Sequence, residues 1–289
     1  MKINLPTVGE NLQDQTNANM MALGKSKFTG VKALAYATFY DIFGEDGQDV
    51  AQAVISNLTD YAAATSKASN GAMSQDQLTT IFQIQYDLLF SDEVPMVEIL
   101  FIPTHSPALI TEFWTLLPFS RGNVHITSAN PEDQPTINPN YFMLDWDIQA
   151  HIAIMKYIRR MYQTAPLQDM IMLEKSPGHA ISENATDSEW EGYAKQNCTT
   201  PLSAPLVSWL EANLTDRSNF HPIGTTAMMP RSMGGVVSDR LMIHGTSNVR
   251  VVDASVLPFQ MCGHLTSTLY AIAERAADFI KEDASDSER

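Results

Sequence analysis

The string NFHPIGTTAMMPRSMGGVV runs from Asn219 to Val237 and opens the part of the chain that most constrains the fold. After it, HGTSNVRVVDASVLPFQ covers His244–Gln260 and GHLTSTLYAIAERAADFIKED covers Gly263–Asp283. Glycines and prolines divide the first two strings into short pieces, of which Val249–Ser255 is the clearest expected strand. The last string has apolar residues at helical spacing, which predicts a helix from about Leu265 to Glu282.

Three further helices are expected upstream of these strings. Apolar residues recur at helical spacing over Gln48–Thr65, Ser74–Phe90 and Asp145–Tyr162. Ser74 is a residue type that caps helix N-termini, and Pro166 would stop the third helix. No internal repeat relates these helices to one another.

The expected strands are short and look antiparallel. Val94–Ile102 is β-branched and aromatic, which favours a strand, and Leu116–Thr127 favours a hairpin-like pair interrupted at Arg121 and Gly122. Met1–Ser26 shows little periodicity and is expected to form loop and a short strand. Lys175–Asn219 is the least periodic region, with short helices and exposed loops expected. This mixture predicts an α+β fold rather than a doubly wound parallel sheet.

The composition indicates a globular protein and argues against nucleic acid as a partner. The 289 residues are 44% hydrophobic and 18% charged, and 18 basic against 33 acidic residues give a formal net charge of −15. A chain this acidic repels phosphate backbones. No apolar run reaches the roughly 20 residues that span a bilayer, so no membrane partner is expected, and the N-terminus lacks the apolar core of a signal peptide. Cys198 and Cys262 cannot form a disulfide framework, and no Cys/His cluster predicts a metal site.

Two histidines stand out as candidates for chemistry. The motifs GxGxxG, GxxxxGK[ST], HExxH and GxSxG are absent, so the usual nucleotide, metal and serine-hydrolase signatures are missing. His221 and His264 each lie next to turn-forming proline or glycine. On opposed loops, one neutral imidazole could accept a hydroxyl proton while the other orients the substrate. The alternative is that each histidine is buried and satisfied by backbone groups.

Neighbouring polar residues strengthen this candidate. Arg217, Asn219 and His221 alternate, so an extended segment would aim all three at one face. The alternative is an arginine that caps a helix end and an asparagine in a turn. Glu98 lies within an apolar expected strand, where an unpaired carboxylate would be costly, so it is either paired or at a bulge or edge.

Taken together, these strings resemble the C-terminal end of the glucose–methanol–choline (GMC) oxidoreductases, in particular the fungal FAD-dependent glucose dehydrogenases and, next, the glucose oxidases. The resemblance extends over nearly the whole chain. It includes NLPTVGENLQDQ at Asn4–Gln15, VEILF at Val97–Phe101, EFWTLLPFSRGNVHI at Glu112–Ile126 and INPNYF at Ile137–Phe142. It departs around Tyr193–Leu214, where this chain has extra residues that include Cys198.

The resemblance implies a role for each candidate residue. It implies that His221 removes the C1 hydroxyl proton of β-D-glucose while hydride passes to flavin N5, and that His264 is the second hydrogen-bonding partner, or that these two roles are exchanged. It implies that Glu98 orients His264. The implied substrate-binding residues are Arg217, Asn219 and Glu112 for sugar hydroxyls, with Trp114 as an apolar wall; a core tryptophan is the alternative for Trp114. The implied flavin-side residues are Asp253, Ala254, Gly263, His264 and Leu265, with Asn11 and Leu12 as weaker candidates.

The implied cofactor is FAD, and the implied partners are a glucose-like sugar and a quinone or dye-like electron acceptor, with gluconolactone as the product. Oxygen as acceptor, as in the glucose oxidases, and a catalytically silent chain stay open. Members of the family carry a GxGxxG near the N-terminus, which is absent here. The chain is therefore expected to correspond to a C-terminal half without the ADP-binding Rossmann half of the FAD site, and the missing N-terminal half is an expected partner.

The resemblance also implies a division into domains and an extracellular location. Residues 31–215 are expected to form a GMC-type substrate-binding domain, an antiparallel sheet with flanking helices. Residues 1–30 would be a partial FAD-domain or connecting segment, and 216–289 a C-terminal part of the FAD-binding domain that carries both histidines. Four Asn-x-Ser/Thr sequons are a mild hint of secretion; they lie at Asn57, Asn184, Asn197 and Asn213.

Overall fold

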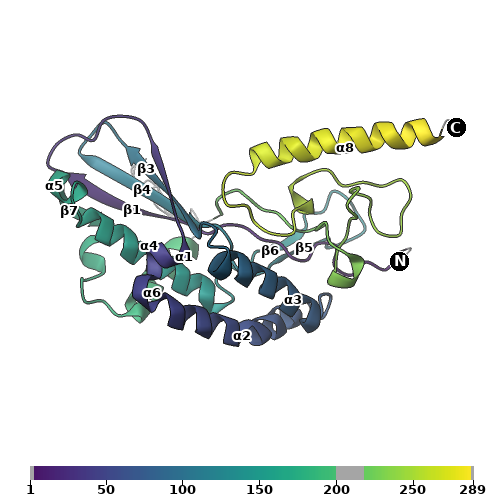
Figure 1. The fold of residues 1–289 in the computed structure, drawn as a ribbon, viewed down its shortest axis with the longest axis horizontal. Helices are drawn as coiled ribbons and strands as arrows, with labels where there is room; N and C mark the ends of the chain where they lie inside the picture. Colours follow the sequence, from purple (N-terminus) through teal and green to yellow (C-terminus); the bar gives the residue numbers. More distant parts are fainter. Residues whose placement is uncertain (1–2, 200–217, 288–289) are drawn as a thin grey trace.

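The computed structural model describes residues 3–199 and 218–287, and its centre is one five-stranded sheet (Figure 1). The strand order is β2-β3-β4-β1-β7, and every neighbouring pair is antiparallel. The predicted α+β class with an antiparallel sheet is confirmed. The strands are β1 Asn17–Gly24, β2 Ala33–Ala37, β3 Val97–Pro103, β4 Ala108–Thr115 and β7 Ile171–Ser176, and β5 Asn123–His125 pairs with β6 Thr136–Asn138 in a separate small sheet.

The helices lie in two places (Figure 1). Most of the long ones gather on one side of the sheet and continue beneath the middle of the molecule, whereas α8 lies at the far end, near both termini. The longer helices are α2 Gly47–Ala68, α3 Gln75–Tyr86, α4 Asp145–Tyr162, α6 Asp187–Thr199 and α8 Thr266–Ser287. The short ones are α1 Phe39–Phe43, η1 Gly44–Asp46, η2 Asp87–Ser91, α5 Leu167–Met170, η3 Gly178–Ala180, η4 Arg231–Met233 and η5 Ala254–Val256.

The predicted helices are confirmed, with one change at an end. The helices expected over 48–65, 145–162 and 265–282 are α2, α4 and α8. The helix expected over 74–90 is α3 followed by the π-helical turn η2. Ser74 caps α3 as predicted, because its side chain accepts a hydrogen bond from the backbone N–H of Gln77.

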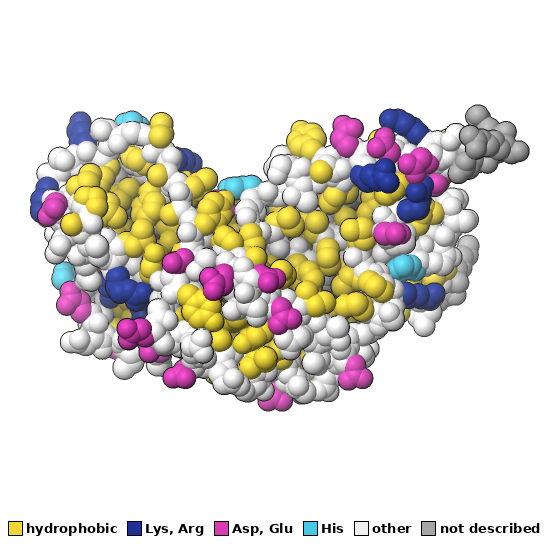
Figure 2. All heavy atoms as spheres, in the orientation of Figure 1, with side chains coloured by type: hydrophobic (Ala, Val, Ile, Leu, Met, Phe, Trp, Pro, Cys, Tyr) yellow, Lys and Arg dark blue, Asp and Glu magenta, His cyan; other side chains and the backbone are white. Residues whose placement is uncertain are grey.

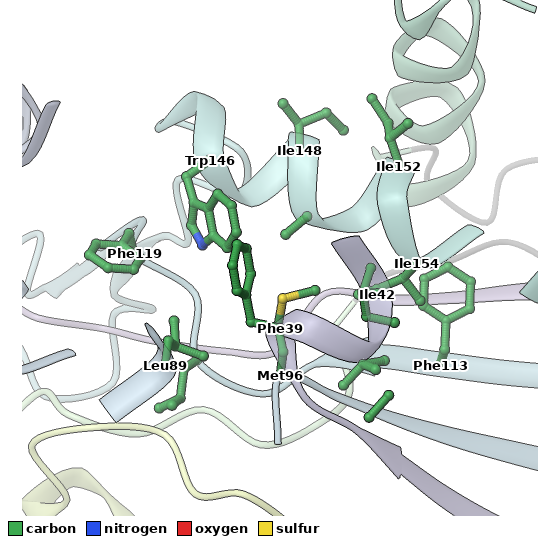
Figure 3. Packing of buried hydrophobic residues seen from close by; sticks show 14 of the residues in the cluster. Phe39, Ile42, Leu89, Met96, Phe113, Phe119, Trp146, Ile148, Ile152 and Ile154 are labelled. Atoms are coloured by element: carbon green, nitrogen blue, oxygen red, sulfur yellow. The ribbon is translucent and has the colours of Figure 1, made fainter. Parts of the chain in front are cut away.

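The main hydrophobic core lies between one face of the sheet and the helices (Figure 3). Phe39 of α1 is fully buried at its centre, 4.5 Å from the ring of Phe90 and 6.0 Å from that of Trp146. Alternate residues of the strands, such as Ile99 and Phe113, point into this core, because successive side chains of a strand point to opposite faces. The other residues of β2, β3, β4 and β1 are thereby turned to the opposite face.

Strand β1 was predicted only as a short strand within a loop, and it is an eight-residue strand between β4 and β7. Its residues are nearly all buried. A strand buried on both faces loses the alternation of polar and apolar residues that marks a half-buried strand. This is why NANMMALG gave a weak signal.

Two expected elements are wrong. The hairpin-like pair over Leu116–Thr127 does not form. Residues 116–120 are irregular, Gly122 makes an isolated bridge to Leu12, and Asn123–His125 pairs with Thr136–Asn138. Pro118 has no N–H for a ladder, and the carbonyls of this segment are used by other residues. The strand over Val249–Ser255 is also absent, since backbone pairing is limited to one bridge between Met242 and Arg250.

Arg121, which follows β4, is buried and connects three parts of the chain. Its guanidinium donates to Asn11 Oδ1 at 2.9 Å and Gln85 Oε1 at 2.6 Å, and to the carbonyl oxygens of Pro118, Phe119 and Ser120. The carboxylate of Asp147 accepts the backbone N–H groups of Phe119 and Ser120, both at 2.7 Å. Burial lowers the pKa of Arg121 to about 9, and the nearby Asp147 carboxylate acts in the opposite direction.

We expect Arg121→Met to lower the free energy of unfolding by about 3–5 kcal/mol, because it leaves several buried oxygens without a donor. Urea unfolding followed by circular dichroism measures this change. Arg231→Met is the control, since Arg231 is exposed and makes one long hydrogen bond to the carbonyl of Asn4; the control should change by less than about 0.5 kcal/mol. Equal effects in the two variants would contradict a structural role for the buried guanidinium.

A second prediction concerns His151 of α4, which is fully buried between the rings of Phe113 and Phe142. Burial lowers its pKa from 6.5 to about 3. Below pH 6.5 the unfolded chain binds a proton at His151 that the folded chain does not. The contribution of His151 to the free energy of unfolding therefore falls as the pH falls toward 3. We expect the unfolding free energy of His151→Leu to fall less steeply over this range than that of the unmodified chain, as measured by urea unfolding at several pH values. His179→Leu, which replaces an exposed histidine, should give a curve parallel to the unmodified one.

Candidate active site

One row of residues across the sheet supports the candidate site. In the registers of neighbouring strands, Tyr36 of β2 faces Glu98 of β3, Glu98 faces Trp114 of β4, and Trp114 faces Asn17 of β1. Residues directly opposite each other in a sheet share a face, so these four side chains form one line on the face away from the core. The next row on that face pairs Glu112 with Asn19.

The first histidine of the site is held by this row. His264 Nε2 lies 2.9 Å from Glu98 Oε1, and Glu98 has no exposed surface. The ring of Trp114 meets that of His264 edge-to-face at 5.8 Å. Tyr36 lies beside the same carboxylate, and burial followed by the charge of Glu98 raises the pKa of Tyr36. The contact expected between Glu98 and His264 is therefore present, and Trp114 is a buried neighbour of the histidine.

The second histidine is held by the N-terminal segment. His221 Nδ1 lies 2.7 Å from Gln15 Oε1 and 3.0 Å from Asn219 Nδ2. Asp14 Oδ1 accepts the backbone N–H of His221 at 3.1 Å, and Gln260 Nε2 donates to the carbonyl of His221 at 2.7 Å. Both the ring and the backbone of His221 are thus fixed by residues distant in sequence.

The two imidazoles face each other. Their ring centroids are 5.5 Å apart and their planes are nearly perpendicular. Burial, and then the proximity of His264, lower the pKa of His221, while Asp14 and Glu98 act in the opposite direction. His221 is therefore neutral near pH 7 and has a nitrogen available to accept a proton. Figure 2 shows that histidine side-chain surface is accessible in the hollow between the end with the sheet and the end with α8.

The residues around Asn219 differ partly from the expectation. The segment is not extended, because Phe220 has a φ of 58°, so simple alternation does not aim Asn219 and His221 at one face. Asn219 nevertheless contacts the ring of His221, and its Oδ1 accepts from Asn17 Nδ2 at 3.4 Å. Arg217 lies outside the described residues. Glu112 is half-buried on the same sheet face as Glu98, and burial raises its pKa, with Lys32 acting in the opposite direction.

Three of the residues expected on the flavin side line hollows in the surface. Leu12, Asp253 and Ala254 line a cavity of about 500 Å³, and Asp253 and Ala254 also border a depression of about 380 Å³ at the start of α8. Gly263 and Leu265 flank His264, with Leu265 buried. Asn11 is buried, and its side chain bonds the carbonyls of Gly224 and Pro258 and the guanidinium of Arg121. Asn11 thus has a structural position, whereas Asp253 and Ala254 border open space.

Sequence reasoning did not single out four polar residues at the site. They are Asp14, Gln15, Asn17 and Gln260, and all contact His221 or Asn219. A signal for them was the polar run from Asn11 to Asn17, whose side chains are mostly buried. Among residues 3–199 and 218–287, no group of three His, Cys, Asp or Glu side chains is arranged to hold a metal ion.

Comparison with known proteins gives the family. Residues 118–273 match the sequence profile of the GMC oxidoreductases. This chain belongs to the GMC oxidoreductase family. It is 37% identical over 283 residues to a glucose oxidase-like protein of Humicola fuscoatra, covering 97% of this chain and 44% of that protein. It is 31% identical over 288 residues to the glucose oxidase of Aspergillus carbonarius, covering 99% of this chain and 44% of that enzyme.

A solved structure shows the same fold. An FAD-dependent oxidoreductase from Chaetomium thermophilum superimposes with a TM-score of 0.75 at 23% sequence identity, over 98% of this chain and 49% of that one. This GMC chain spans about 44% of the length of the two curated relatives named above. Within the described part of the chain, no helix is both long and apolar enough to cross a membrane.

The position of Glu98 leads to a prediction about stability and turnover. A fully buried carboxylate costs free energy to desolvate, so we expect Glu98→Gln to unfold within about 1 kcal/mol of the unmodified chain, or to be more stable. Turnover of the flavin-loaded enzyme should fall by at least about tenfold, because an amide oxygen accepts a weaker hydrogen bond from His264 Nε2 than a carboxylate does and holds the ring less firmly. Thermal unfolding and dye reduction measure the two quantities.

Glu10→Gln is a matched control for that substitution. Glu10 is also buried and lies 2.8 Å from a histidine nitrogen, that of His125, but it makes no contact with His221 or His264. The control should keep turnover within a few-fold. A Glu98→Gln enzyme that is as active as Glu10→Gln would contradict the importance of the carboxylate at this histidine.

Proposed function

We propose that this chain carries the catalytic face of a flavin-dependent sugar oxidoreductase that oxidises the C1 hydroxyl of β-D-glucose to gluconolactone. The observation that carries the proposal is the pair His221 and His264, whose rings lie 5.5 Å apart, each held at one nitrogen by a different part of the chain. Each ring keeps its other nitrogen for a substrate. Membership of the GMC family and the glucose oxidase relatives support the reaction class.

His221 acts as the base in this proposal. With Nδ1 bonded to Gln15, its Nε2 accepts the proton of the sugar hydroxyl, and its lowered pKa keeps it unprotonated near pH 7. In this assignment His264 contacts the same hydroxyl oxygen through Nδ1, while its Nε2 is bound to the Glu98 carboxylate, which orients the ring. The exchanged assignment, with His264 as the base, is the alternative, because a carboxylate at Nε2 also orients an imidazole to accept a proton at Nδ1.

The sugar would be oriented by the polar residues beside the histidines. Asn219 offers both a donor and an acceptor beside His221, and Glu112 offers a half-buried carboxyl group one row along the sheet from Glu98. Arg217 is proposed as a third sugar contact from the resemblance alone. Trp114 is almost fully buried, so it would act chiefly by packing against His264.

The chain presents surfaces that fit a flavin near the histidines. The depression beside Ala254 is lined mainly by apolar side chains, including Val252, Leu269 and Tyr270, of which Val252 and Tyr270 are exposed. Such a surface suits a large aromatic ring system. We propose that Ala254, Gly263 and Leu265 contact the ring side of FAD and that Asp253 contacts its ribityl chain. When bound, the flavin supplies the hydride acceptor, a group that protein side chains lack.

The electron acceptor, location and domain division belong to the same proposal. We propose a quinone or dye-like acceptor, with oxygen as the alternative that the glucose oxidase relatives favour. Secretion is supported by the sequon at Asn184, which is exposed in a turn. The proposed division is 1–30, 31–215 and 216–289, with the ADP part of FAD bound by an N-terminal half that is not within this sequence.

His221→Ala in the flavin-loaded enzyme should lower kcat by about 10²–10⁴, the usual cost of losing a general base. Glucose-dependent dye reduction measures this with FAD and the N-terminal half supplied, and oxygen uptake separates dehydrogenase from oxidase. His179→Ala, at an exposed site, should leave the rate unchanged. A His221→Ala rate within a few-fold of normal would contradict the base assignment. An unmodified chain that binds no flavin and oxidises no sugar even with the N-terminal half supplied would contradict the proposed function.

A further inference from the structure

We infer that Gln15 is a positioning residue that holds His221 in one tautomer, with the proton on Nδ1, and so leaves Nε2 as the nitrogen that accepts the substrate proton. The catalytic meaning of this inference rests on the proposed function. The tautomer itself does not, because it follows from hydrogen bonds within the chain. Gln15 has no exposed surface, so its contacts are not exchanged for water.

The first step is the orientation of the Gln15 side-chain amide. Its Nε2 donates to the carbonyl oxygens of Met261 at 3.3 Å and Leu116 at 3.5 Å. Both partners are acceptors only, so the opposite orientation would place the amide oxygen against two carbonyl oxygens. The amide nitrogen is therefore directed at Met261 and Leu116, and Oε1 is directed at His221.

The second step is the proton on the ring. Gln15 Oε1 lies 2.7 Å from His221 Nδ1 and has no hydrogen to give. A hydrogen bond of this length requires Nδ1–H as the donor, since the other tautomer would place two lone pairs against each other. A neutral imidazole with its proton on Nδ1 has an unprotonated Nε2.

Either orientation of the Asn219 side-chain amide is compatible with the proton on His221 Nδ1. As placed, its Nδ2 lies 3.0 Å from His221 Nδ1 and 3.3 Å from Gln15 Oε1, so it donates to the oxygen, which accepts two hydrogen bonds. With its amide turned over, Asn219 would present an oxygen to Nδ1, which again requires Nδ1–H. Asn219 therefore does not reverse the assignment that Gln15 makes.

The other groups around His221 do not set the tautomer. Asp14 accepts from the backbone N–H of His221 rather than from the ring, and the Tyr141 hydroxyl and the backbone N–H of Gln15 are its other partners. His264 faces the ring at 5.5 Å and is itself bound to Glu98. Among the described residues, Gln15 and Asn219 are the side chains within hydrogen-bond distance of a nitrogen of this imidazole.

The experiment is a ¹⁵N NMR measurement of histidine side chains in the 289-residue chain at neutral pH, which needs neither flavin nor turnover. The His221 signals are identified by their loss in His221→Ala. We expect a protonated Nδ1 and an unprotonated Nε2. In Gln15→Leu the ratio of Nδ1–H to Nε2–H should fall by about tenfold, the factor that one buried hydrogen bond is worth. In the flavin-loaded enzyme kcat should fall by a similar factor with KM nearly unchanged.

Gln13→Leu is the matched control. Gln13 is equally buried, lies two residues upstream and donates to the carbonyl of Pro258 at 2.9 Å, so its loss also removes a side-chain bond to the C-terminal segment. It makes no contact with the ring of His221. The His221 tautomer should be unchanged in this variant, and an equal change in Gln13→Leu and Gln15→Leu would show a general loosening and overturn the inference.

Gln15→Glu keeps the test decisive if Gln15→Leu does not fold. Its carboxylate is still an acceptor, so Nδ1–H should persist, and the nearby negative charge should raise the pKa of His221 by about 1–3 pH units. An Nε2–H tautomer in the unmodified chain, or an unmoved pKa in Gln15→Glu, overturns the inference. A confirmed Nδ1–H tautomer together with no sugar oxidation would instead overturn the proposed function alone.

Discussion

The buried guanidinium of Arg121 is the contact on which the position of the site depends. It binds the irregular turn after β4 to α3 through Gln85 and to the N-terminal segment through Asn11. Asn11 in turn donates to the carbonyls of Gly224 and Pro258, and Gly224 allows this approach because a Cβ there would lie 2.3 Å from the carbonyl oxygen of Asn11. The segments that carry His221 and His264 are thus fixed, through the side chains of Asn11 and Arg121, to α3 and to the turn after β4.

Polar groups are buried around the histidines at a cost in stability. Glu98, Gln13, Gln15 and Gln260 are almost fully buried, where apolar side chains would be cheaper to desolvate. Each orients a backbone carbonyl or a ring nitrogen, and together they fix two imidazoles from different parts of the chain. The arrangement is consistent with a site whose groups are positioned before the substrate arrives, which lowers the reorganisation needed in the reaction.

Much of the fold was predictable because local patterns were strong. The helices α2, α4 and α8 follow from apolar residues at helical spacing, and the cap at Ser74 follows from its residue type. The predictions that failed or were incomplete concerned strands. β1 is buried on both faces and has no alternation, while Val249–Ser255 has β-branched residues but lacks a neighbouring strand over most of its length. Strand formation depends on pairing partners that are distant in sequence, so composition alone decides it poorly.

The sequence by itself determined the family, the α+β class and the pair of histidines, because these depend on residue types within short strings. It also favoured a partner for Glu98, since an unpaired carboxylate within an apolar strand is costly. Only the tertiary structure decided which row of the sheet faces the site, through the registers that align Tyr36, Glu98, Trp114 and Asn17. It alone showed Gln15 at the ring of His221, because that contact joins residues more than 200 positions apart, and no local pattern records such a distance.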